Sequence, residues 1–298
     1  NYTFPEVKPS FEKARLSDEE AKEIPWGVKR VNAYSAWQYT TGKKVKVAVI
    51  DTGIDFNHPD IKPNYKGGYN VVDPSKPPLD DNGHGTHVAG TIAAVKDLKG
   101  VAGVAPDAEL YAVKVLNSSG SGSYSNVISG IEWAFNNKMN VINMSLGSKY
   151  GSDALKEAVK KAYETGIVVV CAAGNDGGAV NYPAAYVPYT LAISASNSSD
   201  KIASFSSRGP EITFIAPGVS IYSTYKDGQY KTLSGTSMAS PHVAGLSALV
   251  VGLGVNSPDK VKEVLIKSAV KLPNLKDTEQ GNGMIDAGRI YQVVNSMR

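Results

Sequence analysis

The chain lacks three features that would each have indicated a particular class of protein. It contains a single cysteine, Cys171, in 298 residues, which excludes an internal disulfide framework. Its net charge of +3, without a block of Lys or Arg, points to neither nucleic acid nor a membrane surface as a partner. No apolar run is long enough to span a bilayer. We therefore expect a globular protein that binds neither nucleic acid nor membrane.

Apolar runs alternate instead with helical patterns along most of the chain. Strands are predicted at 45–50, 109–115, 141–145, 168–171, 191–194 and 213–216, and helices at 83–94, 124–137, 153–165, from 237 onward, 258–268 and 286–294. Such alternation predicts an α/β protein: a single three-layer domain with a mostly parallel central sheet and helices on both faces. Residues 1–22 are polar and indicate an N-terminal extension with one short helix, and residues 23–298 form the domain.

Three residues at predicted strand ends or helix starts have side chains suited to nucleophilic catalysis. Asp51 ends a buried apolar strand, His84 opens a helix pattern, and Ser237 begins another helix among small residues. A serine hydroxyl is too weakly acidic to attack a carbonyl unaided, whereas a neutral imidazole can take its proton and a carboxylate can orient that imidazole. The order Asp, His, Ser along the chain is one of the known orders of this triad.

Other residues compete for two of these roles. His58, His87 and His242 are alternative bases, and Asp55 and Asp60 are alternative acids. We interpret all three histidines as structural. His58 lies in a Pro turn, His87 lies three residues along the same predicted helix as His84, and His242 directly follows Pro241. Neither of the two acids directly ends the apolar strand, so we expect neither to serve in the triad.

Eight motifs carry a resemblance to a known family. They are Val-Ala-Val-Ile-Asp-Thr-Gly-Ile-Asp (47–55), His-Pro-Asp (58–60), Asn-Gly-His-Gly-Thr-His-Val-Ala-Gly (82–90), Gly-Val-Ala-Pro (103–106), Asn-Met-Ser-Leu-Gly (143–147), Ala-Ala-Gly-Asn (172–175), Ala-Pro-Gly (216–218) and Gly-Thr-Ser-Met-Ala-Ser-Pro-His-Val-Ala-Gly (235–245). In this order they resemble the subtilisin-family (subtilase) serine proteases. The resemblance implies a serine endopeptidase that works through an acyl-serine intermediate, with residues 23–298 as its catalytic domain. It also implies that Asn175 and the backbone N–H of Ser237 form the oxyanion hole.

The resemblance further implies where a peptide substrate binds. Ser119, Gly120, Ser121 and Gly122 would flank the substrate backbone on one side, and Ser145, Leu146 and Gly147 on the other. Ala172, Ala173 and Gly174, with Asn181 near the floor, would complete the P1 pocket. Leu116, Tyr124 and Val127 would form an apolar P4 pocket, although a plain helix face is an equal alternative for them. We expect broad specificity with apolar or aromatic preference at P1 and P4.

One loop resembles the high-affinity calcium loop of the family. Carried over, the ligands are the side chains of Asp60 and Asp97 and the carbonyls of Val95, Lys99 and Val101. The family's amide ligand aligns near Lys22, which cannot coordinate, so that Glu23 is the substitute; a solvated surface loop is the alternative. Residues 72–82 resemble less closely a second calcium loop of thermostable relatives, and we expect solvated turn acids there.

The implied partners are polypeptide substrates and the protein's own propeptide, which would serve as folding aid or inhibitor, and we expect a monomer. Residues 1–22 would be a surface-wrapping segment or a remnant of that propeptide. A start at Asn1 rather than Met resembles a processed or trimmed form and permits secretion. We expect an extracellular protein, with a cytoplasmic role as the alternative. Two other functions remain open. A dedicated processing protease would show an acid-lined groove, for which Asp176 is the obvious candidate, and a non-catalytic scaffold would lack one of the catalytic residues.

Overall fold

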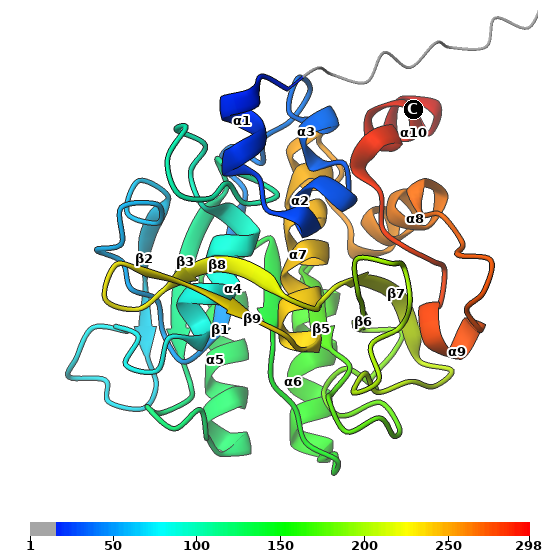
Figure 1. The fold of residues 1–298 in the computed structure, drawn as a ribbon. Helices are drawn as coiled ribbons and strands as arrows, with labels where there is room; N and C mark the ends of the chain where they lie inside the picture. The colour runs from blue at the N-terminus through cyan, green and yellow to red at the C-terminus, as the bar shows by residue number, and fades with distance from the viewer. Residues whose placement is uncertain (1–15) are drawn as a thin grey trace, which may run out of the picture.

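A seven-stranded parallel sheet forms the centre of the computed structural model, which describes residues 16–298 (Figure 1). The strands are β1 (Lys46–Asp51), β2 (Tyr65–Asn70), β3 (Glu109–Lys114), β4 (Val141–Met144), β5 (Val168–Ala172), β6 (Leu191–Ser196) and β7 (Ile212–Pro217). Their order across the sheet is β2-β3-β1-β4-β5-β6-β7, and every pair of neighbours is parallel. After β3 the chain crosses to the other side of β1, and ligands of open α/β sheets bind at such a reversal.

Helices cover both faces of this sheet. On one face lie α4 (His84–Ala93) and α7 (Thr236–Gly252), and on the other lie α5 (Tyr124–Asn136) and α6 (Asp153–Glu164). Side chains alternate between the two faces along each strand, so that Val47 and Val49 join one core and Ala48 and Ile50 the other. The predicted three-layer α/β fold is therefore confirmed, and the six predicted strands agree with the observed ones to within two residues.

Short helices surround the layers. They are α1 (Asp18–Glu23), α2 (Trp26–Arg30), α3 (Ala33–Ala36), α8 (Pro258–Ser268), α9 (Asp277–Gln280) and α10 (Ile290–Ser296), the last preceded by a 3₁₀ turn at Ala287–Arg289. Helix α1 begins at the cap Ser17, whose hydroxyl accepts from the Glu20 N–H, and it crosses the predicted boundary between residues 22 and 23. Residues 1–15 of the predicted extension lie outside the described part of the chain. No helix within residues 16–298 is both long enough and apolar enough to cross a membrane.

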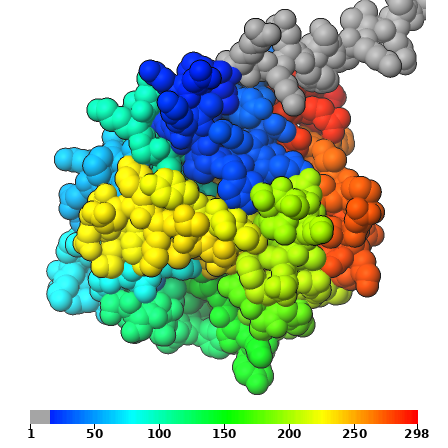
Figure 2. Space-filling model, viewed as in Figure 1, coloured from blue at the N-terminus to red at the C-terminus, as the bar shows by residue number. Residues whose placement is uncertain are grey.

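Three strands were not predicted from the sequence. One is β2, and the others are β8 (Ile221–Tyr225) and β9 (Gln229–Leu233), which form an antiparallel hairpin outside the main sheet. Figure 2 shows this hairpin, in yellow, at the surface beside the dark blue N-terminal helices. It covers α4, where the imidazole of His87 contacts the carbonyls of Ile221 and Lys231 at 3.0 and 2.9 Å.

Candidate active site

A hydrogen-bonded pair of His84 and Asp51 lies at the carboxyl edge of the sheet. Asp51 is the last residue of β1, and its buried carboxylate approaches Nδ1 of His84 with Oδ1 at 2.7 Å. The same oxygen accepts the Thr52 N–H at 2.7 Å, whereas Oδ2 is buried and accepts no hydrogen bond from the described residues. His84 begins α4 directly after Gly83, whose φ of +112° and close contact with the Tyr225 ring both require glycine.

The surroundings of His84 stabilise its protonated imidazole more than water stabilises that of a free histidine side chain. Burial of His84 opposes the charged form, but the charge of Asp51 and its hydrogen bond to Nδ1 act in the other direction, and Asp80 adds to them. The net result is a pKa of His84 above its ordinary value of 6.5. The imidazole can therefore accept a proton at neutral pH and be stabilised once it holds that proton.

Ser237 reaches the same place as the second residue of α7, a helix that packs against α4 on the same face of the sheet. Its hydroxyl donates to the carbonyl of Ser145 at 3.2 Å, and within residues 16–298 it makes no hydrogen bond to His84. Catalytic hydrogen bonds are often loose before substrate binds, and a serine hydroxyl changes partner by a rotation about χ1. The structure thus brings Ser237 and His84 to one cleft without joining them.

A proline inside α7 explains why the hydroxyl of Ser145 also bonds to the backbone carbonyl of Ser237. Pro241 has no N–H, so the carbonyl of Ser237, four residues earlier, lacks its helical donor. The hydroxyl of Ser145 donates to that carbonyl at 2.8 Å instead. Behind it, the Asn143 amide donates to Ser145 Oγ at 3.0 Å and accepts the Ser240 hydroxyl at 2.7 Å. This chain of hydrogen bonds fixes the first turn of α7 against the end of β4.

The amide of Asn175 faces Ser237 in a defined orientation. Its Oδ1 accepts both the backbone N–H and the hydroxyl of Thr236, each at 2.8 Å. With its oxygen so engaged, the amide has Nδ2 left as a donor that bonds to none of residues 16–298, and both Asn175 and Ser237 line the cleft. Gly174, with φ at +117°, provides the backbone turn that presents this side chain after β5.

The cleft around these residues has a volume of about 600 Å³. Every residue predicted to bind substrate lines it except Ala173, which is fully buried behind the wall. Further lining residues, which were not predicted from the sequence, are Thr52, Asn82, Ser148, Leu155, Tyr182, Pro183 and Thr236. None of the lining residues is acidic.

Comparison with known proteins agrees with this geometry. The profile of the Subtilase family matches residues 42–283. The chain belongs to the subtilase family. It is 49% identical to Subtilisin DY of Bacillus licheniformis over 274 residues, which cover 89% of this chain and 98% of that protein. The match to Subtilisin E of Bacillus subtilis is 53% over 247 residues, or 80% of this chain. A thermostable alkaline protease of Halalkalibacterium halodurans is 47% identical over 274 residues, covering 90% of this chain and 74% of that protein.

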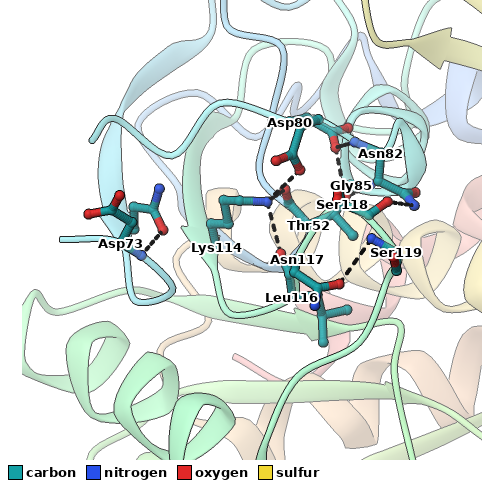
Figure 3. Close-up of polar contacts among 12 residues, drawn as sticks. Thr52, Asp73, Asp80, Asn82, Gly85, Lys114, Leu116, Asn117, Ser118 and Ser119 are labelled. Atoms are coloured by element: carbon teal, nitrogen blue, oxygen red, sulfur yellow. Dashed lines mark hydrogen bonds and ion pairs between the residues drawn. The ribbon is translucent and has the colours of Figure 1, made fainter. Parts of the chain in front are cut away.

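The resemblance to the subtilases seen in the motifs is thus confirmed. The chain spans 64% of the length of Subtilisin E. In this subtilase Asn82, which the sequence analysis passed over, links two sides of the cleft. Its Oδ1 accepts the His84 N–H at 3.0 Å, and its Nδ2 donates to the Ser118 carbonyl at 2.9 Å (Figure 3). The Asn82-Gly83 pair directly before His84 is the sequence feature that could have indicated this role of Asn82.

The competing histidines all lie away from the cleft lining of the subtilase. His58, His87 and His242 are buried, and each contacts a backbone carbonyl through a ring nitrogen. Burial lowers the pKa of His87 and of His242 to about 4. Since these two rings are neutral and enclosed, neither is placed to exchange protons with a substrate.

The predicted calcium loop brings several oxygen atoms toward one region. The Glu23 carboxylate accepts the Asp97 N–H at 2.7 Å through Oε1, while its Oε2 is buried without a hydrogen-bond partner. Asp60 Oδ2 accepts the Val101 N–H at 3.0 Å. Burial raises the pKa of both Glu23 and Asp60. Within the described residues no three His, Cys, Asp or Glu side chains form a metal cluster, so any site here depends on backbone carbonyls.

The prediction of solvated acids at residues 72–82 is wrong for Asp80, whose exposed fraction is 5%. Its Oδ1 accepts the Thr52 hydroxyl at 2.9 Å and the N–H groups of Asn82 and Gly83, and its Oδ2 accepts from Thr86. A carboxylate with this many donors is stable when buried. Asp80 therefore holds the start of α4, and hence His84, rather than a solvated turn.

Proposed function

We propose that this protein is a serine endopeptidase that cleaves peptide bonds through an acyl-Ser237 intermediate. The observation that carries the proposal is the meeting of Ser237, the Asp51–His84 pair and the Asn175 amide at one cleft. Its membership of the subtilase family supports the same conclusion. A non-catalytic scaffold would not need a donor oriented toward the nucleophile or a carboxylate bonded to the histidine.

Each group has a defined task in this mechanism. His84 takes the proton of Ser237 as the hydroxyl oxygen bonds to the substrate carbonyl carbon, and the Asp51 carboxylate stabilises the resulting imidazolium. Nδ2 of Asn175 and the N–H of Ser237 donate to the oxyanion that forms. His84 then returns the proton to the leaving amine, and water repeats the sequence to release the acyl group. Ser237 lies in the first turn of α7, where the helix dipole also favours the negative charge.

Covalent labelling tests this proposal directly. A fluorophosphonate should form one adduct per chain, on the peptide that contains Ser237, with loss of fluoride. A His84→Ala variant, which keeps the serine but removes its base, should label far more slowly. A parent protein that stays unlabelled under conditions that label a known subtilisin would favour the scaffold instead.

The specificity that we propose is broad, with apolar or aromatic residues at P1 and P4. The absence of acidic groups among the cleft-lining residues supports it. Asp176, the acid suspected at the rim, accepts the Ser207 hydroxyl at 2.8 Å, and its Oδ2 lies 4.0 Å from Lys149 Nζ. These contacts already occupy and partly neutralise its charge, so a processing protease with basic specificity is disfavoured.

Asn181 should limit the size of the P1 side chain. Its Nδ2 lies 2.6 Å from where a Cβ on Gly174 would be, so the amide is close against the wall of the cleft. Replacing Asn181 by Gly should deepen the pocket and raise kcat/KM for P1 Phe or Tyr relative to P1 Ala by about tenfold. A peptide library with varied P1 measures this ratio in both proteins. An unchanged ratio, or a parent profile dominated by acidic P1 residues, would contradict the proposal.

The pH dependence of kcat/KM should reflect His84. Only the neutral imidazole can act as base, so activity falls as the pH drops through the pKa of His84 in the free enzyme. Because that pKa lies above 6.5, the acid limb of the profile should have its midpoint above pH 6.5. Protonation of His87 and His242 near pH 4 is too far away to produce this limb. A midpoint below pH 6.5 would show that Asp51 does not control the imidazole as described.

We also propose a structural calcium ion held by Asp60, Asp97 and the carbonyls of Val95, Lys99 and Val101, with Glu23 as an additional ligand. The buried, unpartnered Glu23 Oε2 supports this, since calcium prefers such oxygen ligands. None of the three carbonyls accepts a hydrogen bond from the described residues. Bound calcium would neutralise the buried carboxylates; it would take no part in the peptide cleavage itself.

Calcium at 100 times its dissociation constant should stabilise the protein by about 2.7 kcal/mol relative to chelator. For a domain of this size that corresponds to a rise of about 5 °C or more in Tm. Glu23→Gln is the matched variant, because it keeps an acceptor for the Asp97 N–H and removes one charge. Its Tm in chelator should equal or exceed that of the parent, and its gain from calcium should be smaller. A parent Tm unmoved by chelator would contradict the site.

The remaining proposals concern the partners and the compartment. We propose that the protein is a monomer that acts on polypeptides outside the cell, and that its own propeptide assists folding or inhibits the cleft. An unselective endopeptidase suits an extracellular role better than a cytoplasmic one. Fractionation of the producing cells tests the compartment, and the sedimentation mass of the purified enzyme tests the oligomeric state. Refolding with and without the propeptide tests whether the propeptide assists folding.

A further inference from the structure

Lys114 is a buried lysine at the end of β3, with a side chain only 5% exposed. It is paired with Asp51 on one side and with Asn70 of β2 on the other. Its ammonium group donates to the carbonyl of Thr52 at 2.6 Å, to the carbonyl of Leu116 at 2.8 Å and to Asp81 Oδ1 at 2.8 Å. All three of its N–H groups are thus used. Figure 3 shows the side chain extended between Thr52 and Leu116 toward the Asp80–Asn82 turn.

The two carbonyls lie where the paired strands separate. Both N–H groups that follow β3, on Val115 and Leu116, bond to the Asp51 carbonyl at 3.0 and 3.2 Å. Beyond that point the chains diverge, and within residues 16–298 the carbonyls of Thr52 and Leu116 accept only the Lys114 ammonium. A buried ammonium is costly to desolvate, so an apolar side chain would be expected at this position unless these groups need a donor.

The Asp51–His84 pair does not depend on Lys114 alone. Thr52, next to Asp51, is also held by its hydroxyl, which donates to Asp80 and accepts the Gly85 N–H at 2.8 Å. Asp80 in turn fixes the residues around His84. The loss of Lys114 would therefore leave most of the contacts around the pair in place.

The segment that begins at Leu116 is held by fewer contacts. Leu116 and residues 119–122 line the cleft on the side where we propose the substrate backbone binds. The segment folds on itself through Asn117, whose Oδ1 accepts the Ser119 and Ser121 N–H groups at 2.9 and 3.1 Å. Its other side-chain links to the rest of the site are the Asn82 bond to Ser118 and the Lys114 bond to Leu116.

We propose that Lys114 is a positioning residue that sets the substrate-binding segment, Leu116 to Gly122, relative to the catalytic pair. This inference rests on the proposed function, because it assigns a role in binding substrate along that segment. Extended peptides, which use the segment as a binding edge, depend on Lys114, whereas a small ester that reaches only the P1 pocket and Ser237 does not.

The test compares the substitution Lys114→Met with the parent enzyme on two substrates. One is an apolar tetrapeptide p-nitroanilide, and the other is an N-acetylated single-residue ester with the same P1 residue. Because small displacements of a binding group have large kinetic effects, kcat/KM for the tetrapeptide should fall by about tenfold to 100-fold, and that for the ester by no more than about threefold. Asp81→Asn is the matched control: the Asp81 side chain is 56% exposed and both carbonyls keep their lysine, so kcat/KM for both substrates should stay within about threefold of the parent.

Three results would overturn the inference. An equal loss on both substrates would mean that Lys114 acts on the catalytic pair, and a lower Tm with parental kinetics would mean that it only stabilises the fold. The third is a parent enzyme that is labelled at Ser237 but shows no preference for the longer substrate. If the parent is not labelled at all, the proposed function itself has failed. Should Lys114→Met not fold, Lys114→Gln, which keeps two donors, must show the same dependence on substrate length.

Discussion

Replacing Ser237 by Ala should reduce kcat for peptide hydrolysis by about 10⁶-fold, a magnitude already established for this substitution in a subtilisin rather than derived from this structure. Without the hydroxyl no acyl-enzyme can form, and only binding and the oxyanion donors remain. The fold should be little affected, because among residues 16–298 the hydroxyl makes a single hydrogen bond, to the Ser145 carbonyl. A Tm close to that of the parent is therefore part of the expected result.

The double variant Ser237→Ala, His84→Ala provides the control for this prediction. His84 acts only through the serine, so its removal in the double variant should cost almost nothing further. Kinetics are measured with active-site titration of the parent, so that a trace of parent enzyme is not mistaken for residual activity. The double variant could instead lose kcat by the product of the two single-variant factors. That result would contradict a mechanism in which the two side chains act as one unit.

Most of the sheet could be predicted because its strands are continuous apolar runs, but β2 could not. Its sequence, Tyr65 to Asn70, contains the pair Gly67-Gly68, and glycine is unfavourable in strands. The structure shows why Gly68 is there: a Cβ on it would lie 1.9 Å from the Ala112 carbonyl oxygen of the neighbouring strand. The glycine in β2 is therefore required by its close contact with β3, and the sequence of β2 alone does not reveal that contact.

The hairpin of β8 and β9 did have a signal in the sequence. Asp227-Gly228 lies between two runs rich in β-branched and aromatic residues, which is typical of a tight hairpin turn. Asp227 has φ of +61° and Gly228 of +68°, the backbone region that such turns require. The hairpin lies outside the βα alternation of the main sheet, so that alternation does not predict it.

Some residues of the candidate site can be predicted from sequence motifs, whereas others acquire their role only through contacts made in the folded chain. Asp51, His84, Ser237 and Asn175 could be named because each lies within a motif, at or within three residues of the end or start of an element. Thr236 could not be assigned its contact with Asn175, because the two residues are 61 positions apart and meet only at the sheet edge. Buried polar groups such as Asp80 resemble solvated turn acids in a sequence, since burial depends on the hairpin and helix that enclose them.

The second large effect is expected at the oxyanion donor. Replacing Asn175 by Leu should lower kcat by about 10²- to 10³-fold, again the magnitude established for this substitution in a subtilisin. KM should change little, because Nδ2 donates to a charge that forms only in the transition state. The structure adds a reason why the amide is oriented correctly: both Thr236 donors, each at 2.8 Å, bind Oδ1 and leave Nδ2 free on the Ser237 side.

Asn175→Asp is the sharper variant because it changes the free donor and little else. An aspartate keeps an acceptor for the Thr236 N–H and hydroxyl, has nearly the same volume, and places a carboxylate oxygen where Nδ2 was. It should therefore lose at least as much in kcat as the leucine variant while retaining the Tm of the parent, since repulsion of the oxyanion replaces a missing hydrogen bond. Thr236→Val completes the series: it removes the hydroxyl bond but not the backbone bond to Oδ1, and its loss in kcat should be intermediate. If the aspartate variant kept more than about a tenth of the parental kcat, stabilisation of the oxyanion by Asn175 would be excluded.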